Sequence, residues 1–176
     1  RDNELSSGDH QAYINKKTGK LLFNVTGTHN LKDWVTDSYL AFGGLKNTTR
    51  YKEADKMLKK AKEKYNPSSV SITGHSLGGS IAGLISNKND KVTTLDGGYT
   101  IGQKTRSNNA YRTAGDAVSL LGANAKNMTT LKNNQNHKQL ITGALSGGII
   151  GAGIGAVKDV LKAHDINNIK NEKIFV

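Results

Sequence analysis

The sequence predicts an α/β fold in which helices flank a central, mostly parallel sheet. Strand-like and helix-like segments alternate from residue 20 onwards. Alternation of this kind favours parallel strands whose connecting helices cover the sheet. The chain has 176 residues, of which 35% are hydrophobic, and a chain of this length forms one core. A single domain over residues 1–176 is therefore expected.

The first elements are predicted to form a β-hairpin. Residues 10–15 alternate between polar and apolar side chains, the sequence KKTG is typical of a turn, and residues 20–27 predict the second strand. Residues 28–44 mix Trp, Leu and Val with two Asp, which predicts a loop carrying a short helix.

The clearest helix covers residues 50–65. Its apolar side chains recur at helical spacing on one face, and they belong to Tyr51, Ala54, Leu58, Ala61 and Tyr65. The other face is mostly Lys and Glu, which indicates a solvated surface or one attracted to an anionic interface. The sequence NPSS then ends the helix.

Three further strands and one helix complete the expected centre of the fold. Residues 69–73 read as a buried strand, and residues 77–87 as a helix of small and aliphatic side chains. Further strands are expected at residues 91–96 and 109–115. A helix of small residues can pack closely against such a sheet.

The net charge of +11 favours anionic partners, such as an acidic lipid surface. Nucleic acid is not expected, because no aromatic-plus-basic motif is visible. The absence of Cys excludes disulfides and Cys-based zinc sites. Since residue 1 is Arg rather than Met, we expect a processed or truncated chain, and a targeting segment could precede this numbering.

Ser76 lies in the spacing G-x-S-x-G, between a predicted strand and a predicted helix. That context suits a nucleophile held on a strained strand-to-helix turn, where the glycines remove side chains that would clash. The following helix N-terminus directs a backbone N–H toward a developing oxyanion. We therefore interpret Ser76 as a candidate nucleophile.

A serine nucleophile needs a base and an acid, which follow it in the chain on sheets of this kind. The downstream histidines are His137 and His164. Asp96 and Asp116 both follow strand-like segments, whereas Asp90 precedes one. The residues alone leave Asp96 and Asp116 open as the acid.

The chain resembles the class 3 lipases, which include the fungal triacylglycerol lipases and have an α/β-hydrolase fold. The resemblance runs from about Ala12 to Asn168. It depends most on LFNVTGTHNLKDWVTDSYL and VSITGHSLGGSIAGLIS, and also on YRTAGDAVSLL and AHDINNI. The chain departs from the family at GGLKNTTR and at DGGYTIG, where family members carry H-x-G-F and G-x-P-R-x-G.

The resemblance implies a role for each matching residue. It makes Ser76 the nucleophile, Asp116 the acid and His164 the base. It places the backbone N–H groups of Thr28 and Leu77 in an oxyanion hole. It also implies a lid-like segment with Asp33, Trp34 and Asp37, and no metal or organic cofactor.

Residues 140–157 form a glycine-rich insertion without a charged side chain, for which we know no family counterpart. Gly143, Gly147, Gly151 and Gly155 are spaced four residues apart, a small-xxx-small pattern. The stretch could be a membrane span, a packed helix or helical hairpin, or a segment that inserts at an interface. A span is disfavoured, because it would separate the implied acid from the implied base.

The leading hypothesis is a lipase or phospholipase that cleaves carboxylic esters of lipids through an acyl-enzyme. The expected partners are a lipid or phospholipid substrate and an anionic membrane surface, so the protein is expected to be membrane-associated. The alternative is a membrane-active structural protein whose glycine-rich segment perturbs bilayers and whose hydrolase site is vestigial.

Overall fold

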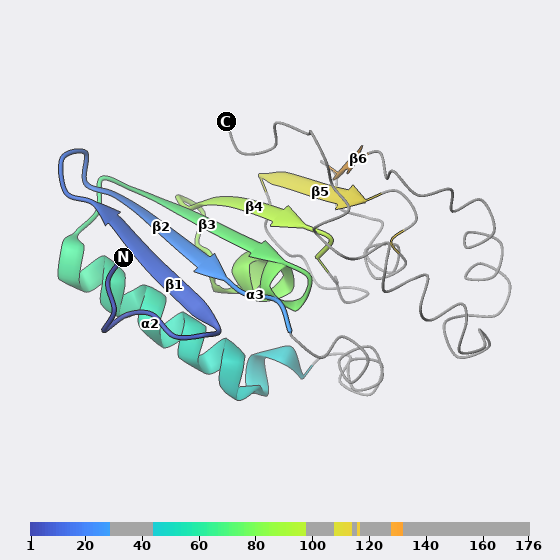
Figure 1. Ribbon diagram of the computed structural model, residues 1–176, viewed down its shortest axis with the longest axis horizontal. Coiled ribbons are helices and arrows are strands. Elements are labelled where there is room, and N and C mark those ends of the chain that lie inside the picture. Colours follow the sequence, from blue (N-terminus) through green and yellow to red (C-terminus); the bar gives the residue numbers. More distant parts are fainter. Residues whose placement is uncertain (29–43, 98–107, 114–115, 117–127, 132–176) are drawn as a thin grey trace, which may run out of the picture.

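The computed structural model describes residues 1–28, 44–97, 108–113, 116 and 128–131 (Figure 1). Within these residues one sheet has the strand order β1-β2-β3-β4-β5-β6. Strands β1 and β2 are antiparallel, and every later neighbouring pair is parallel. The strand bounds are His10–Asn15, Lys20–Val25, Ser69–His75, Lys91–Leu95, Asn109–Thr113 and Met128–Leu131.

The predicted hairpin is confirmed. Strands β1 and β2 pair in register, with Ala12 opposite Phe23. Asn15 closes the first strand, because its side-chain oxygen accepts the N–H groups of Lys17 and Thr18 at 3.0 and 3.2 Å. Gly19 then takes a φ of +67°, a conformation that glycine adopts without steric cost. Strand β2 ends two residues earlier than expected, at Val25.

The helix expected at residues 50–65 is α2, Thr49–Tyr65. The short 3-10 helix η1, Leu45–Asn47, precedes it. The hydroxyl of Thr48 caps α2 by accepting the N–H of Tyr51. At the other end Asn66 has a left-handed φ of 39°, which directs the chain toward β3.

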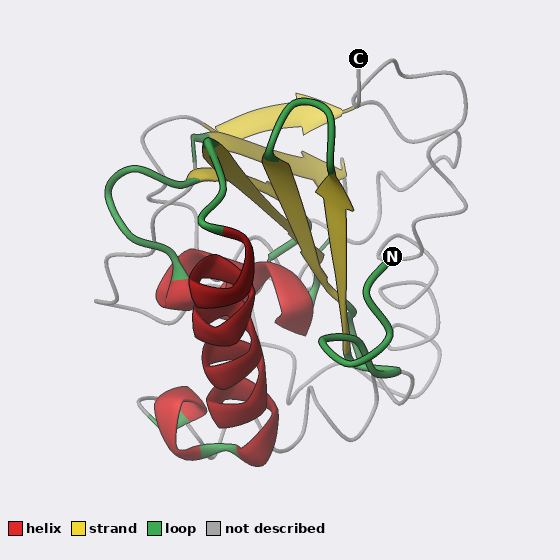
Figure 2. Ribbon diagram, turned by 90° about the vertical axis from the view of Figure 1, so that its left-hand side faces the viewer, coloured by secondary structure: helices red, strands yellow, loops and turns green. Residues whose placement is uncertain are grey.

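Helix α3, Leu77–Ile85, is the helix expected at residues 77–87. It packs on β2, β3 and β4 and also contacts α2. Nearly all of its residues are buried, so it lies at the centre of the fold. Both described helices lie on the same side of the sheet, as Figure 2 shows.

The core lies between these two helices and the sheet. Its largest buried side chains include Leu21, Phe23 and Ile72 from the strands, with Leu58 from α2 and Ile81 from α3. Burial of apolar side chains such as these contributes about 1.5–3 kcal/mol each. The inward face expected for α2 is confirmed: its small and aliphatic members are buried, and its two tyrosines pack partly buried against the core.

The predicted α/β-hydrolase class is confirmed, with a central, mostly parallel sheet and helices packed against it. Strand β6 was not anticipated. It is short, and its two central threonines are exposed, so it lacks the apolar pattern of the other strands. The helix expected within residues 28–44 falls mainly outside the described residues, and the glycine-rich insertion falls wholly outside them.

The amino-terminal arm is fastened to the last turn of α2. The carboxylate of Asp2 accepts hydrogen bonds from Lys64 Nζ at 2.8 Å and from the Tyr65 hydroxyl at 2.5 Å. The Lys64 ammonium group is the main cause of the strongly lowered pKa of Asp2. Among the helices that the structure describes, none is long and apolar enough to cross a bilayer.

Candidate active site

The candidate site lies at the edge of the sheet where the parallel strands end. Strands β2, β3, β4 and β5 point the same way (Figure 1), so the residues that follow them meet at one edge. These are residues 26–28 after β2, Ser76 after β3, Asp96 after β4 and Asp116 after β5. In open α/β sheets this carboxyl edge is where ligands bind.

Ser76 is the turn residue between β3 and α3. It has φ 56° and ψ −128°, a conformation that residues other than glycine rarely adopt and that stores strain. Its backbone N–H donates to the Leu95 carbonyl at 3.0 Å, and its own carbonyl accepts the Ser80 N–H at 3.2 Å. The side chain is only 1% exposed.

The hydroxyl of Ser76 has no hydrogen-bond partner among the residues that the structure describes. A buried hydroxyl without a partner costs about 1–3 kcal/mol. Among the described residues, the turn therefore combines backbone strain with a polar atom that has no partner. Both concentrate at functional sites.

The glycines around Ser76 are required by close backbone contacts. A Cβ atom at Gly74 would overlap the Gly78 carbonyl, and one at Gly78 would overlap the Val25 carbonyl oxygen. The start of α3 therefore rests directly on the backbones of β2 and β3. This contact explains the first and last glycine of the G-x-S-x-G spacing.

Leu77 is the first residue of α3 and is buried. The first turn of an α-helix leaves N–H groups without acceptors inside the helix and carries a partial positive charge. The backbone N–H of Leu77 therefore belongs to a helix end suited to hold negative charge beside Ser76.

Residues 26–28, which we call the β2 turn, lie beside Ser76. A Cβ built on Gly27 would lie 3.4 Å from Ser76 Cβ and 3.0 Å from the His75 carbonyl oxygen. Thr28, the last described residue of this segment, is partly buried. The structure thus brings the two predicted oxyanion segments, the β2 turn and the start of α3, to the same serine.

The two candidate acids differ in their contacts. Both carboxylate oxygens of Asp96 accept hydrogen bonds from Thr113, one from its N–H at 2.5 Å and one from its hydroxyl at 2.6 Å. These bonds tie the end of β4 to the end of β5. Asp116 is 1% exposed, and its backbone N–H donates to the Thr113 carbonyl at 3.1 Å. The contacts of Asp96 favour a structural role for it.

Part of the predicted site lies outside the described residues. His164, the implied base, and the lid-like residues Asp33, Trp34 and Asp37 lie outside the described residues. His137, the other candidate base, lies outside them as well. The described part of the chain contains no group of His, Asp or Glu side chains arranged to hold a metal ion.

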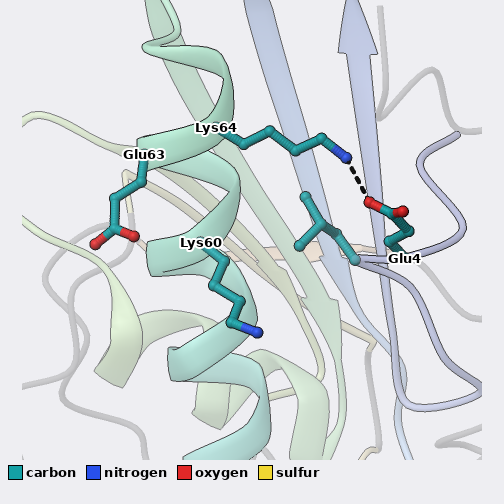
Figure 3. Close-up of a pocket in the computed structure, with 5 residues that line it drawn as sticks. Glu4, Lys60, Glu63 and Lys64 are labelled. Atoms are coloured by element: carbon teal, nitrogen blue, oxygen red, sulfur yellow. Dashed lines mark hydrogen bonds and ion pairs between the residues drawn. The ribbon is translucent and has the colours of Figure 1, made fainter.

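A pocket elsewhere on the molecule lies between the amino-terminal arm and α2 (Figure 3). It is lined by Glu4, Leu5, Lys60, Glu63 and Lys64, and Lys64 Nζ bonds the Glu4 carboxylate at 2.8 Å. The last turn of α2 leads into the first residue of β3, at the opposite edge of the sheet from Ser76. This pocket therefore belongs to the fastening of the arm rather than to the candidate site.

Comparison with models of known protein families assigns this chain to a family. The model described as lipase (class 3) matches residues 22–120, which is more than half of the chain. The chain belongs to the class 3 lipase family. The match covers the β2 turn, the Ser76 turn and both candidate acids, and it ends before His164.

Solved structures with a similar course include two lipases. One is the Rhizomucor miehei lipase in complex with its propeptide, at 18% identity and a TM-score of 0.46, covering 73% of this chain and 53% of that one. The other is a triacylglycerol lipase with a serine protease triad, at 17% identity and a TM-score of 0.48, covering 72% of this chain and 62% of that one. The chain thus spans less than two thirds of either lipase. No curated protein sequence matched it significantly.

Proposed function

We propose that this chain is a serine hydrolase that cleaves the carboxylic esters of lipids, as a lipase or phospholipase. The observation that carries the proposal is the hydroxyl of Ser76. It is buried, held on a strained turn and without a partner in the described part of the chain. Membership of the class 3 lipase family supports the same reaction class.

In the proposed triad His164 is the base and Asp116 is the acid. The His164 imidazole takes the proton from Ser76 as its oxygen attacks the acyl carbonyl carbon. Asp116 orients the imidazole and stabilises its protonated form. The place of Asp116 supports its role, because it follows the strand two positions along the sheet from β3. Neighbouring strands are about 4.8 Å apart, which leaves room for an imidazole ring between the acid and the serine.

The negative charge that develops on the carbonyl oxygen is proposed to be held by the N–H groups of Thr28 and Leu77. Two observations support this pair: the close approach of Gly27 to Ser76, and the start of α3 directly after Ser76. The protonated His164 then gives its proton to the leaving alcohol, and an acyl-enzyme remains. Water activated by His164 breaks the acyl–serine bond and releases the fatty acid.

An anionic lipid surface is the proposed site of action. The net charge of +11 supports attraction to acidic headgroups. On α2 three lysines are paired with carboxylates: Lys59 with Asp55, Lys62 with Asp90, and Lys64 with Asp2 and Glu4. Three other exposed lysines are left for such a surface, namely Lys52, Lys56 and Lys60.

The lipid surface proposal has its own test. Hydrolysis of the same ester should be faster on anionic vesicles than on neutral vesicles at low salt, and added salt should reduce the difference. Equal rates on both kinds of vesicle would contradict the anionic surface and leave the hydrolase unaffected. The segment containing Asp33, Trp34 and Asp37 is proposed to act as a lid at this surface.

The decisive experiment labels the protein with a fluorophosphonate probe and measures hydrolysis of a short, water-soluble ester. The wild-type chain should be labelled at Ser76, and Ser76→Ala should abolish labelling. His164→Ala should lower turnover by a factor on the order of 10⁴ or more, whereas the matched change His137→Ala should leave turnover unchanged.

Two results would overturn the assignment. One is a wild-type chain that neither hydrolyses esters nor reacts with the probe. The other is normal turnover in Ser76→Ala. Vesicle leakage that persists unchanged in Ser76→Ala would instead favour a membrane-active structural protein.

A further inference from the structure

Arg50, in the first turn of α2, ties this helix to the β2 turn. Its Nη2 atom donates to the Thr26 carbonyl at 2.7 Å and to the Gly27 carbonyl at 3.3 Å. The same nitrogen lies 3.2 Å from a carboxylate oxygen of Asp9. One guanidinium therefore contacts two successive carbonyls and a carboxylate.

The bond to the Gly27 carbonyl has a direct geometric consequence. The carbonyl of Gly27 and the N–H of Thr28 belong to one planar, trans peptide unit. The two groups therefore point in opposite directions. When Arg50 holds the carbonyl on the α2 side, the N–H of Thr28 is directed to the other side of the turn.

The orientation of this peptide unit depends on contacts from other residues, because residue 27 is glycine. With no Cβ, Gly27 can rotate its flanking peptide units at little steric cost. The space around it nevertheless admits no side chain without adjustment, because an added Cβ would lie 3.0 Å from the His75 carbonyl. Glycine is therefore needed at position 27 for the close approach to the His75 carbonyl. Contacts from other residues then set the orientation of its peptide unit.

The surroundings of Arg50 hold the same turn from the β1 side. The backbone carbonyl of Asp9 accepts the N–H of Thr26 at 2.9 Å. The side chain of Gln11 donates to the Thr26 hydroxyl at 3.1 Å. Asp9 thus bonds the β2 turn with its backbone carbonyl and bonds Arg50 with its side-chain carboxylate. These contacts join the hairpin, the β2 turn and α2 in one network.

We infer that Arg50 is a positioning residue that orients the backbone N–H of Thr28 toward the oxyanion through the carbonyl of Gly27. The inference rests on the proposed function, in which Thr28 supplies one of the two oxyanion donors. Arg50 does not touch the substrate. Removing it leaves the donor present but free to turn away, so the transition state loses more than the bound substrate does.

The test compares Arg50→Met, Arg50→Lys and the control Lys59→Met, which removes an exposed cation further along the same helix. Turnover is measured on a water-soluble ester and divided by the concentration of Ser76 that the fluorophosphonate probe labels at completion. Arg50→Met should lower kcat by about 10- to 100-fold with KM nearly unchanged, less than the loss expected when a donor is deleted. Arg50→Lys should recover part of the loss, and Lys59→Met should match the wild type.

A second readout does not depend on activity. Hydrogen exchange in the peptide spanning residues 24–28 should be faster in Arg50→Met than in the wild type and in Lys59→Met. Wild-type kcat per labelled site in Arg50→Met would overturn the inference. So would a loss that is explained entirely by fewer labelled molecules.

The two proposals can fail separately. A wild-type chain that is inert toward both ester and probe contradicts the proposed hydrolase. An active chain in which Arg50→Met leaves both kcat per labelled site and exchange of the β2 turn unchanged contradicts the positioning role alone. If the wild type is inert, faster exchange in Arg50→Met still shows that Arg50 holds the β2 turn, and the oxyanion role falls with the hydrolase.

Discussion

Two neighbouring strands, β3 and β4, are each followed by a turn residue with a strained backbone. The two turn residues differ in the hydrogen bonding of their side chains. Ser76 follows β3 with a φ of 56°, and Asp96 follows β4 with a φ of 47°. Both side chains are almost fully buried. The carboxylate of Asp96 is bonded through both oxygens to Thr113, whereas the Ser76 hydroxyl has no partner in the described part of the chain.

The same kind of backbone strain therefore occurs with a fully bonded side chain at Asp96 and with a different side-chain environment at Ser76. At Asp96 the cost of the left-handed backbone is offset by two hydrogen bonds that join β4 to β5. At Ser76 the described contacts stabilise the backbone, and the hydroxyl has no partner among the described residues. Strain alone therefore does not mark a candidate functional residue in this molecule, because Asp96 is strained as well; at Ser76 the strain occurs together with a buried hydroxyl that has no partner among the described residues.

The strongest way to break the comparison is to remove each side chain and measure activity and stability together. Ser76→Ala should lower ester turnover by a factor on the order of 10⁶. Its free energy of unfolding in urea should equal or exceed that of the wild type, because the described residues leave this buried hydroxyl without a partner. A clear loss of stability in Ser76→Ala would mean that the hydroxyl has a structural partner.

The steric origin of the Ser76 turn is tested at Gly78. Gly78→Ala should lower the free energy of unfolding by about 3 kcal/mol or more, because the new Cβ would overlap the Val25 carbonyl and force α3 away from β2. Urea unfolding measures the loss. Gly8→Ala is the matched control, since a Cβ there meets nothing within 4 Å. Equal stability of the two variants would contradict the close contact.

Removing the side chain of Asp96 should lower the stability of the protein, unlike removing the hydroxyl of Ser76. Asp96→Ala should cost about 3 kcal/mol of unfolding free energy, because it leaves the N–H and the hydroxyl of Thr113 buried without their acceptor. Thr113→Val removes only the hydroxyl bond and should cost about 1 kcal/mol. A double-mutant cycle in urea should show that the two changes are coupled. Independent, additive losses would contradict the bond between them.

The smallest effect concerns pH and lies outside both turns. His10 is buried and stacks on Phe23 with 5.6 Å between the ring centroids. Burial lowers its pKa from 6.5, so the unfolded chain takes up the proton first as the pH falls. Stability should therefore decrease as the pH falls below 6.5, by at most about 1.4 kcal/mol per pH unit, until the folded state is also protonated.

Urea unfolding between pH 8 and pH 5 measures this slope, and His10→Gln should flatten it. Asp2 does not interfere. Its lowered pKa adds stability that is present above 3.8, the usual value, and is lost only as the pH falls below it. A slope that persists in His10→Gln would assign the proton to another group.

Local patterns were enough to predict much of the fold. The apolar face of α2, the alternation in the hairpin and the apolar strand before G-x-S-x-G are each visible within a few residues of sequence. The Ser76 turn was predicted for the same reason, because its glycines and its serine are close together in the chain.

Contacts between distant residues could not be predicted in this way. Asp96 and Asp116 both follow strands, and only the bonds to Thr113 favour the structural role of Asp96. Arg50 was not singled out in the sequence, although its guanidinium reaches back to the β2 turn. A possible signal was chemical: Arg50 is the one arginine in a helix whose other cations are all lysine, and arginine is suited to contact several acceptors at once.

The close packing of Gly78 on Val25 has a consequence for the time at which the site is assembled. The described contacts that shape the Ser76 turn come from residues between Val25 and Leu95, a stretch that leaves the ribosome well before His164 is synthesised. The serine can thus be set in place on a nascent chain. In the proposed mechanism that chain has no proton acceptor yet, so hydrolytic activity begins only when translation has passed the base.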